Sequence, residues 1–175
     1  MKILAGLEPP TTGTRDLGTN VGVAYYAQHA LEGMTESNTV LQEIDTVTPK
    51  WTVPQQRSLL GAFLFSDNDS IEKQVRVLSG GEKALVAISL YFAIMRVNPP
   101  SFCMLDEIEA ALDDVNVVRF ANYLRRMNQK TQFIVITHRR GTMEEADHLF
   151  GVTMQEKGVS RVIELSLDEA AKTIS

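Results

Sequence analysis

Two short apolar segments joined by a helix-length segment constrain the fold of this chain more than any other feature. "SFCML" begins at Ser101 and "QFIVIT" at Gln132, and the segment between them, 114–129, has a polar face. Strands that are apolar throughout are typical of parallel sheets, whose neighbouring strands are joined by a helix. The sequence therefore predicts an α/β fold with a mainly parallel sheet, in one domain of 175 residues.

Other segments have the patterns of helices and strands. We expect helices at "MKILAG" (the last turns of one), 37–45, 54–65, 82–97, "TMEEAD" and from Asp168 onward. We expect strands at "NVGVAYYAQ", "HLFGVTMQ" and "SRVIEL". The helix over 82–97 is apolar on almost every side, which predicts that it is buried, and the two helices within 37–65 form a small helical insert.

The composition is that of a soluble cytoplasmic protein. Hydrophobic residues make up 44% and charged residues 22%, the net charge is −5, and no apolar run approaches the roughly 18 residues of a membrane span. The single cysteine, Cys103, excludes an internal disulfide and is predicted to be a buried structural thiol. The acidic balance gives no overall attraction to DNA. A local basic patch is the alternative to a solvated surface for Arg119, Arg125, Arg126, Lys130, Arg139 and Arg140.

The stretch "LSGGE", 78–82, stands at the start of the predicted buried helix. Ser79 and Glu82 fit a capping box, which is the structural interpretation of this stretch. Gly80 and Gly81 would also let the backbone approach a phosphate closely, at the helix end whose dipole favours an anion. The stretch therefore has two interpretations, a capped helix start and a phosphate contact.

Two acids follow the apolar strand in "FCMLDE". Ligands of open α/β sheets bind at the carboxyl ends of the strands, where Asp106 and Glu107 would emerge. Asp106 is the candidate ligand of Mg²⁺, and Glu107 is the candidate for polarising the water that attacks a γ-phosphate. An ordinary acidic turn after a strand is the alternative.

An aspartate and a histidine extend this pattern. Asp113 is either the N-cap of the next helix or an aspartate that passes between two nucleotide sites. His138, directly after "FIVIT", is either structural or a group that bonds the γ-phosphate at the end of the second apolar strand.

Together, these motifs resemble the ABC ATPase superfamily, in the order signature, Walker B, D-loop and switch histidine. Residues 84–168 resemble the C-terminal lobe of a bacterial SMC head, in "FCMLDEIEAALDDVNVVRFANYL" and "TQFIVITHRRGTMEEADHLFGVTMQEKGVS". Residues 1–83 resemble an ABC-F ATP-binding domain, in "MKILAGLEPPTTGT", "VGVAYYAQH", "TVLQEI" and "RSLLGAFLFSDNDSIEKQVRVLSGGEK". This resemblance implies that Gln28 is a Q-loop residue that contacts Mg²⁺, and that 84–175 is an SMC-like lobe joined to an ABC-F-like part over 1–83.

The resemblance also implies ATP and Mg²⁺ as cofactors, although the chain contains no GxxxxGK[ST] phosphate loop. We therefore expect a partial ABC-type domain that lacks the phosphate-loop strand and is inactive as an ATPase alone. Its partner would be a second head or an N-terminal lobe that carries the loop, in chromosome segregation. The alternatives are an ABC-F protein acting in translation and a non-catalytic module that binds a kleisin-type subunit at about 148–173. DNA or the ribosome would be contacted only indirectly, and the membrane not at all.

Overall fold

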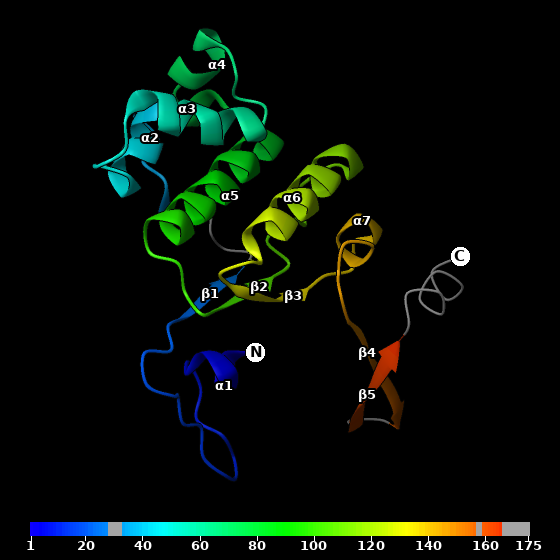
Figure 1. Cartoon of the computed structure of the whole chain (residues 1–175). Coiled ribbons are helices and arrows are strands. Elements are labelled where there is room, and N and C mark those ends of the chain that lie inside the picture. Colours follow the sequence, from blue (N-terminus) through cyan, green and yellow to red (C-terminus); the bar gives the residue numbers. More distant parts are fainter. Residues whose placement is uncertain (28–32, 157–158, 166–175) are drawn as a thin grey trace.

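A three-stranded parallel sheet lies at the centre of the molecule. The computed structural model describes residues 1–27, 33–156 and 159–165. Strands β1 (Val23–Ala27), β2 (Phe102–Asp106) and β3 (Gln132–Ile136) pair in the order β1-β2-β3. In this register Ala27 pairs with Asp106, and Asp106 pairs with Ile136, so the carboxyl ends of all three strands meet at one edge (Figure 1).

Two long helices cover one face of this sheet. They are α5 (Gly80–Val97) and α6 (Asp114–Met127), the latter connecting β2 to β3 as the sequence predicts (Figure 1). Phe92 of α5 and Phe120 of α6 are both fully buried, with ring centroids 6.0 Å apart. The apolar faces of α5, α6 and β2 therefore form a single core.

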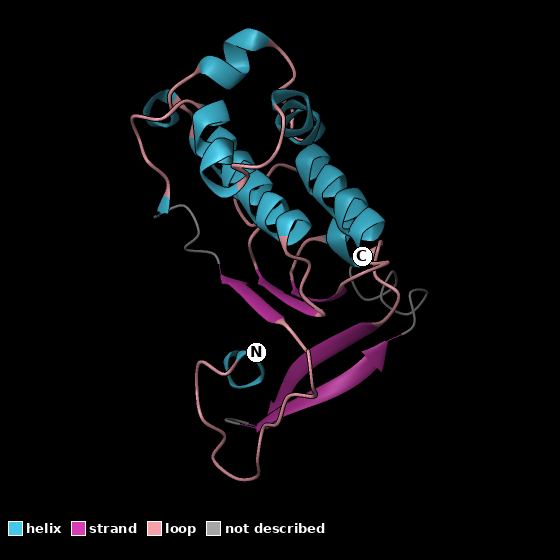
Figure 2. Ribbon diagram, turned by 60° about the vertical axis from the view of Figure 1, so that its left-hand side comes forward, coloured by secondary structure: helices cyan, strands magenta, loops and turns pink. Residues whose placement is uncertain are grey.

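A helical part packs against α5 on the side away from the sheet (Figures 1 and 2). It contains α2 (Val40–Val47), α3 (Val53–Ala62), α4 (Asn68–Glu72) and a 3₁₀ turn (Val75–Val77). Ile44 and Leu60 are fully buried and extend the core into this part. Capping boxes at Thr39 and Thr52 begin α2 and α3.

The remaining elements lie at the two ends of the described chain. Helix α1 (Lys2–Ala5) ends at Gly6, whose φ of 82° is the left-handed conformation that favours glycine. The short helix α7 (Arg140–Met143) follows β3, and β4 (Leu149–Glu156) pairs antiparallel with β5 (Val159–Leu165). Figure 2 shows this hairpin beyond the face of the sheet that α5 and α6 leave uncovered.

Most predicted elements are confirmed, including the α/β class and the parallel sheet. Two predictions are wrong. The helix expected at "TMEEAD" occupies Arg140–Met143 instead, and "QFIVIT" is not a buried strand, since Ile136 is 39% exposed. The reason is that β3 lies at an edge of the described sheet and has helices on one face only. The helix expected from Asp168 lies outside the described residues. Over the described ranges, no helix is long and apolar enough to cross a membrane.

Candidate functional site

Asp106 and Glu107 lie at the carboxyl end of β2, as predicted. The hydroxyl of Tyr25, on β1, donates a hydrogen bond of 2.7 Å to Oδ2 of Asp106. This bond, together with desolvation, raises the pKa of Tyr25 above its ordinary value. The sequence analysis did not identify Tyr25. The signal that could have found it was a polar group on the strand that pairs with β2. Tyr25 therefore orients the carboxylate that is the candidate Mg²⁺ ligand.

Glu107 and His138 come from adjacent strand ends and lie together. The distance from Oε1 of Glu107 to Nδ1 of His138 is 3.5 Å, and the two side chains are 40% and 63% exposed. The backbone amide of Glu107 donates to the carbonyl of Ile136, at 3.1 Å. Glu107 has a φ of 52°, an unusual conformation for a residue with a side chain. The turn after β2 thus places this carboxylate beside the histidine and open to solvent.

Asp113 is the N-cap of α6. Its side chain accepts hydrogen bonds from the backbone amide and the side-chain amide of Asn116, at 2.9 and 3.0 Å. The structural interpretation of Asp113 is therefore confirmed, whereas its role between two nucleotide sites stays a prediction. Because Asp113 is exposed, a second chain can still reach it.

The stretch "LSGGE", 78–82, which resembles the ABC signature, lies at the start of α5. The hydroxyl of Ser79 accepts from the amide of Glu82, and the carboxylate of Glu82 accepts from the amide and hydroxyl of Ser79, at 2.8 and 2.7 Å. These bonds hold the pKa of Glu82 below its ordinary value. Gly80 and Gly81 are exposed, and a Cβ at either would meet no atom within 4 Å. The capping box is confirmed, and the two glycines are exposed to solvent.

The structure divides the predicted site residues into two groups. Asp106, Glu107 and His138 share the carboxyl edge of the sheet. In the described part of the chain, no hydrogen bond or ion pair joins them to residues 79–82. Gln28 lies outside the described residues, directly after Ala27, the register partner of Asp106.

Asp106 fits a magnesium site that is completed by other groups. Among the described residues there is no group of three or more His, Cys, Asp or Glu side chains that could hold a metal ion. Mg²⁺ needs no such cage, because it is commonly held by one or two carboxylates, water and substrate phosphates. Among the described residues, the side-chain hydrogen bond to Asp106 comes from Tyr25 to Oδ2, and none reaches Oδ1. The chain therefore provides one suitable oxygen ligand at the right edge of the sheet.

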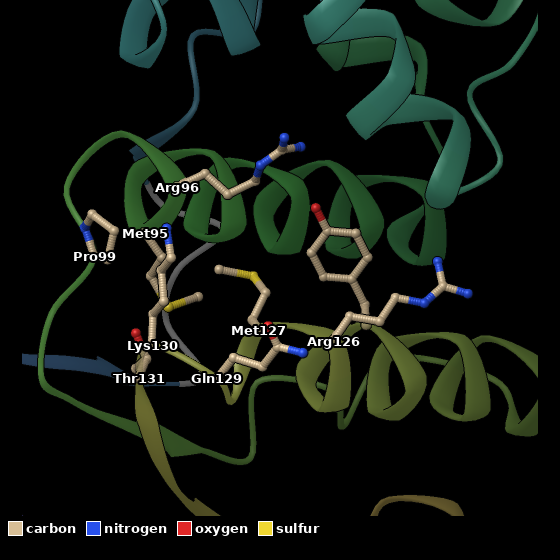
Figure 3. A pocket seen from close by; sticks show the side chains of 9 residues that line it. Met95, Arg96, Pro99, Arg126, Met127, Gln129, Lys130 and Thr131 are labelled. Carbon is tan, nitrogen blue, oxygen red and sulfur yellow. The ribbon is translucent and has the colours of Figure 1, made fainter.

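A cavity of about 460 Å³ lies at the opposite edge of the sheet. It is lined by the last residues of α5 and α6 and by Thr131, which directly precedes β3 (Figure 3). Met127 extends from α6 toward α5 in this view, and the guanidinium of Arg96 lies 4.9 Å from the ring centre of Trp51. Ligands of open α/β sheets bind at the other edge, so this cavity is separate from the candidate site.

Comparisons with known proteins show which proteins share this sequence and fold. The chromosome partition protein Smc of Bacillus subtilis (strain 168) is 60% identical over 102 residues, which are 58% of this chain and 9% of that protein. The SMC head domain from Thermotoga maritima is 31% identical with a TM-score of 0.62, over 82% of this chain and 54% of that one. An SMC head bound to the C-winged helix domain of ScpA is 30% identical with a TM-score of 0.59, over 83% and 56%.

The chain spans less than a tenth of the length of the Bacillus relative. The likeness of residues 1–83 to ABC-F domains stays a prediction. The family described as "RecF/RecN/SMC N terminal domain" matches residues 23–161, a range that contains both acids, the signature and the histidine. Because this match covers most of the chain, the chain belongs to the RecF/RecN/SMC N-terminal domain family.

Proposed function

We propose that this chain is part of an SMC-type ATPase head that acts in chromosome segregation and contributes half of a composite ATP site. The observation that carries the proposal is the 3.5 Å approach of Glu107 to His138, beside Asp106, at the carboxyl edge of a parallel sheet. An acidic pair and an imidazole at this edge suit phosphoryl transfer, which depends on positioning and electrostatic stabilisation.

In this proposal each residue has a separate role. Asp106 holds Mg²⁺, which, when bound, neutralises charge on the β- and γ-phosphates. Glu107 orients and polarises the attacking water, and its exposed carboxylate is free to do so because its contact with His138 is long and solvated. His138 bonds the γ-phosphate. Gln28, next to the strand end, completes the magnesium site.

The signature serves a second head. Gly80 and Gly81 are exposed at the start of an 18-residue helix, so their amides can meet a phosphate bound by another subunit. Ser79 and Glu82 hold this helix end in shape before the nucleotide arrives. Asp113, at the start of α6, is the further residue we place between the two nucleotide sites.

The test combines this chain with an N-terminal SMC head lobe that carries a phosphate loop. The chain alone should hydrolyse ATP no faster than buffer, because it contains no such loop, and the mixture should bind ATP in the presence of magnesium. Glu107→Gln should trap ATP-dependent dimers in size-exclusion chromatography, since it keeps the shape but loses the water-polarising charge. Ser79→Arg should abolish these dimers but not ATP binding, because its bulk blocks the approach of backbone to phosphate.

Two exposed positions supply matched controls. Glu72→Gln, on α4, is the control for Glu107→Gln, because it removes a carboxylate in the same way. Ser66→Arg, in the loop before α4, is the control for Ser79→Arg, because it adds the same side chain. Both should behave like the parent chain. Magnesium-dependent hydrolysis by the chain alone, or dimers of Ser79→Arg equal to those of Glu107→Gln, would contradict the composite site.

A specific surface favours a second, non-catalytic function. On β4 and β5, Phe150, Val152 and Val162 are 61%, 72% and 64% exposed, and Val152 pairs with Val162 across the hairpin. We propose that this hairpin, within the segment 148–173, binds a kleisin-type subunit. A pull-down with the C-winged helix domain of ScpA, compared between the parent chain and Val152→Glu, tests it, and equal capture would refute it.

A further inference from the structure

Glu109 is an acidic side chain buried inside the turn that carries the candidate site. It lies between Glu107 and Asp113 and is 0% exposed. Its Oε1 accepts a hydrogen bond of 3.1 Å from the hydroxyl of Thr142, whereas Oε2 is buried and has no hydrogen-bond partner among the described residues. A buried carboxyl group with one unpaired oxygen costs stability, so packing alone does not account for an acid at this position.

The hydrogen bond joins the segments that follow two different strands. Glu109 belongs to the turn after β2, and Thr142, 6% exposed, belongs to α7 after β3 and His138. Helix α7 also packs tightly on α6, because a Cβ at Gly141 would lie 3.2 Å from the side chain of Val117. The position of Thr142 is therefore well defined, and through it the position of Glu109.

Two other side-chain pairs join these two segments in the described residues, Arg139 with Asp114 and Glu107 with His138. Arg139 bonds Asp114 at 2.8 Å, but the side chain of Asp114 is 99% exposed. Exposed ion pairs of this kind contribute little. The contact between Glu107 and His138 is itself solvated, so neither pair fixes the distance between the two candidate catalytic groups.

We propose that Glu109 and Thr142 are a positioning pair that sets the geometry of Glu107 and His138. Their bond fixes the turn after β2 against the segment after β3, and neither residue touches substrate. This inference rests on the proposed function for its effect on catalysis, but its structural part is testable on the chain alone.

The first test measures amide hydrogen exchange of the full chain. The amides of Glu107, Ala110 and Leu112 donate to Ile136, Glu107 and Glu109 and so report on the turn. Thr142→Val should speed their exchange about five- to tenfold, the equivalent of one lost hydrogen bond, and Thr142→Ser should restore the parent rates. Thr131→Val is the matched control, because Thr131 is also buried, at 2% exposed, and its hydroxyl also donates a hydrogen bond, to the main-chain carbonyl of Pro100 at 2.8 Å, but at the far edge of the sheet.

The second test separates positioning from stability. The double variant Glu109→Met/Thr142→Val replaces both partners by apolar groups, a change that leaves stability nearly unaltered, so it remains folded even where a single variant does not. In the composite head it should lower kcat about tenfold at unchanged KM for ATP, because misplaced groups slow the chemical step. Thr131→Val should keep the parent kcat.

The outcomes of the two tests are distinguishable. The inference would be overturned if the amides of the turn exchanged at the parent rate in both Thr142→Val and the double variant. It would also be overturned if the double variant kept the parent kcat. Failure of the parent chain to form any active composite head would refute the proposed function instead, and the exchange rates would still decide whether Glu109 and Thr142 fix the turn.

Discussion

Tyr25 shows how a single residue prepares the candidate site. Its hydroxyl bonds one oxygen of Asp106 and leaves the other for a ligand. Below the raised pKa of Tyr25 the hydroxyl keeps its proton, so the bond is present throughout the physiological range and is lost only at alkaline pH. Tyr25, on the neighbouring strand, thus sets the orientation of the Asp106 carboxylate before any metal binds.

The thiol of Cys103 can report on whether the chain is folded. It is fully buried in β2, and burial raises the pKa of its thiol to about 12. The reactive thiolate is therefore scarce in the folded chain from pH 7 to 9, whereas in the unfolded chain it becomes abundant as the pH approaches about 8.5. We expect a disulfide reagent to label Cys103 at pH 8 at least about a hundredfold more slowly in the native chain than in urea. Equal labelling rates would show that β2 is accessible.

Helix α6 combines a structural and a proposed functional role in its N-cap. Asp113→Ala removes the acceptor for the Asn116 amide, and we expect it to lower the free energy of unfolding by about 1 kcal/mol. Asp113→Asn keeps a good cap and should lose less than half of that in a urea titration. In the composite head, however, both variants should weaken ATP-dependent dimers. If the loss of dimers instead matched the loss of stability, so that Asp113→Asn formed dimers normally, Asp113 would act only as an N-cap.

The elements also show what sequence reasoning can reach. The strand–helix–strand unit and the capping box at Ser79 were predictable, because periodicity and capping are local properties. The helix expected at "TMEEAD" occupies Arg140–Met143 instead, and its bond from Thr142 to Glu109 joins residues 33 positions apart, which a local pattern does not reveal. Tyr25 and Glu109 were missed for the same reason, because their roles depend on which strands become neighbours.

At the scale of the whole molecule, the uneven cover of the sheet is the main feature. Helices α5 and α6 lie on one face, and the β4–β5 hairpin lies beyond the other (Figure 2). This hairpin carries exposed apolar side chains. Exposed apolar strands of this kind are contact surfaces or aggregation sites. The described chain is therefore suited to contact with another lobe or subunit.

This feature predicts the solution behaviour of the isolated chain. Val152→Glu should shift it from associated species toward monomer in light scattering after size exclusion, because the charge interrupts the apolar surface of the hairpin. Val115→Glu, at a position 67% exposed on α6, is the matched control and should change nothing. A parent chain that is already a monodisperse monomer would contradict this prediction.

The left-handed backbone of Glu107 has a consequence for how such a chain evolves. With a φ of 52°, this position suits glycine or asparagine better than glutamate, which costs about 1 kcal/mol there. Selection for folding alone would replace the acid, and Glu107→Gly should leave the chain at least as stable while removing the carboxylate that we propose polarises water. A lineage that needs only the scaffold should therefore lose this glutamate early, and a lineage under selection for turnover should keep it.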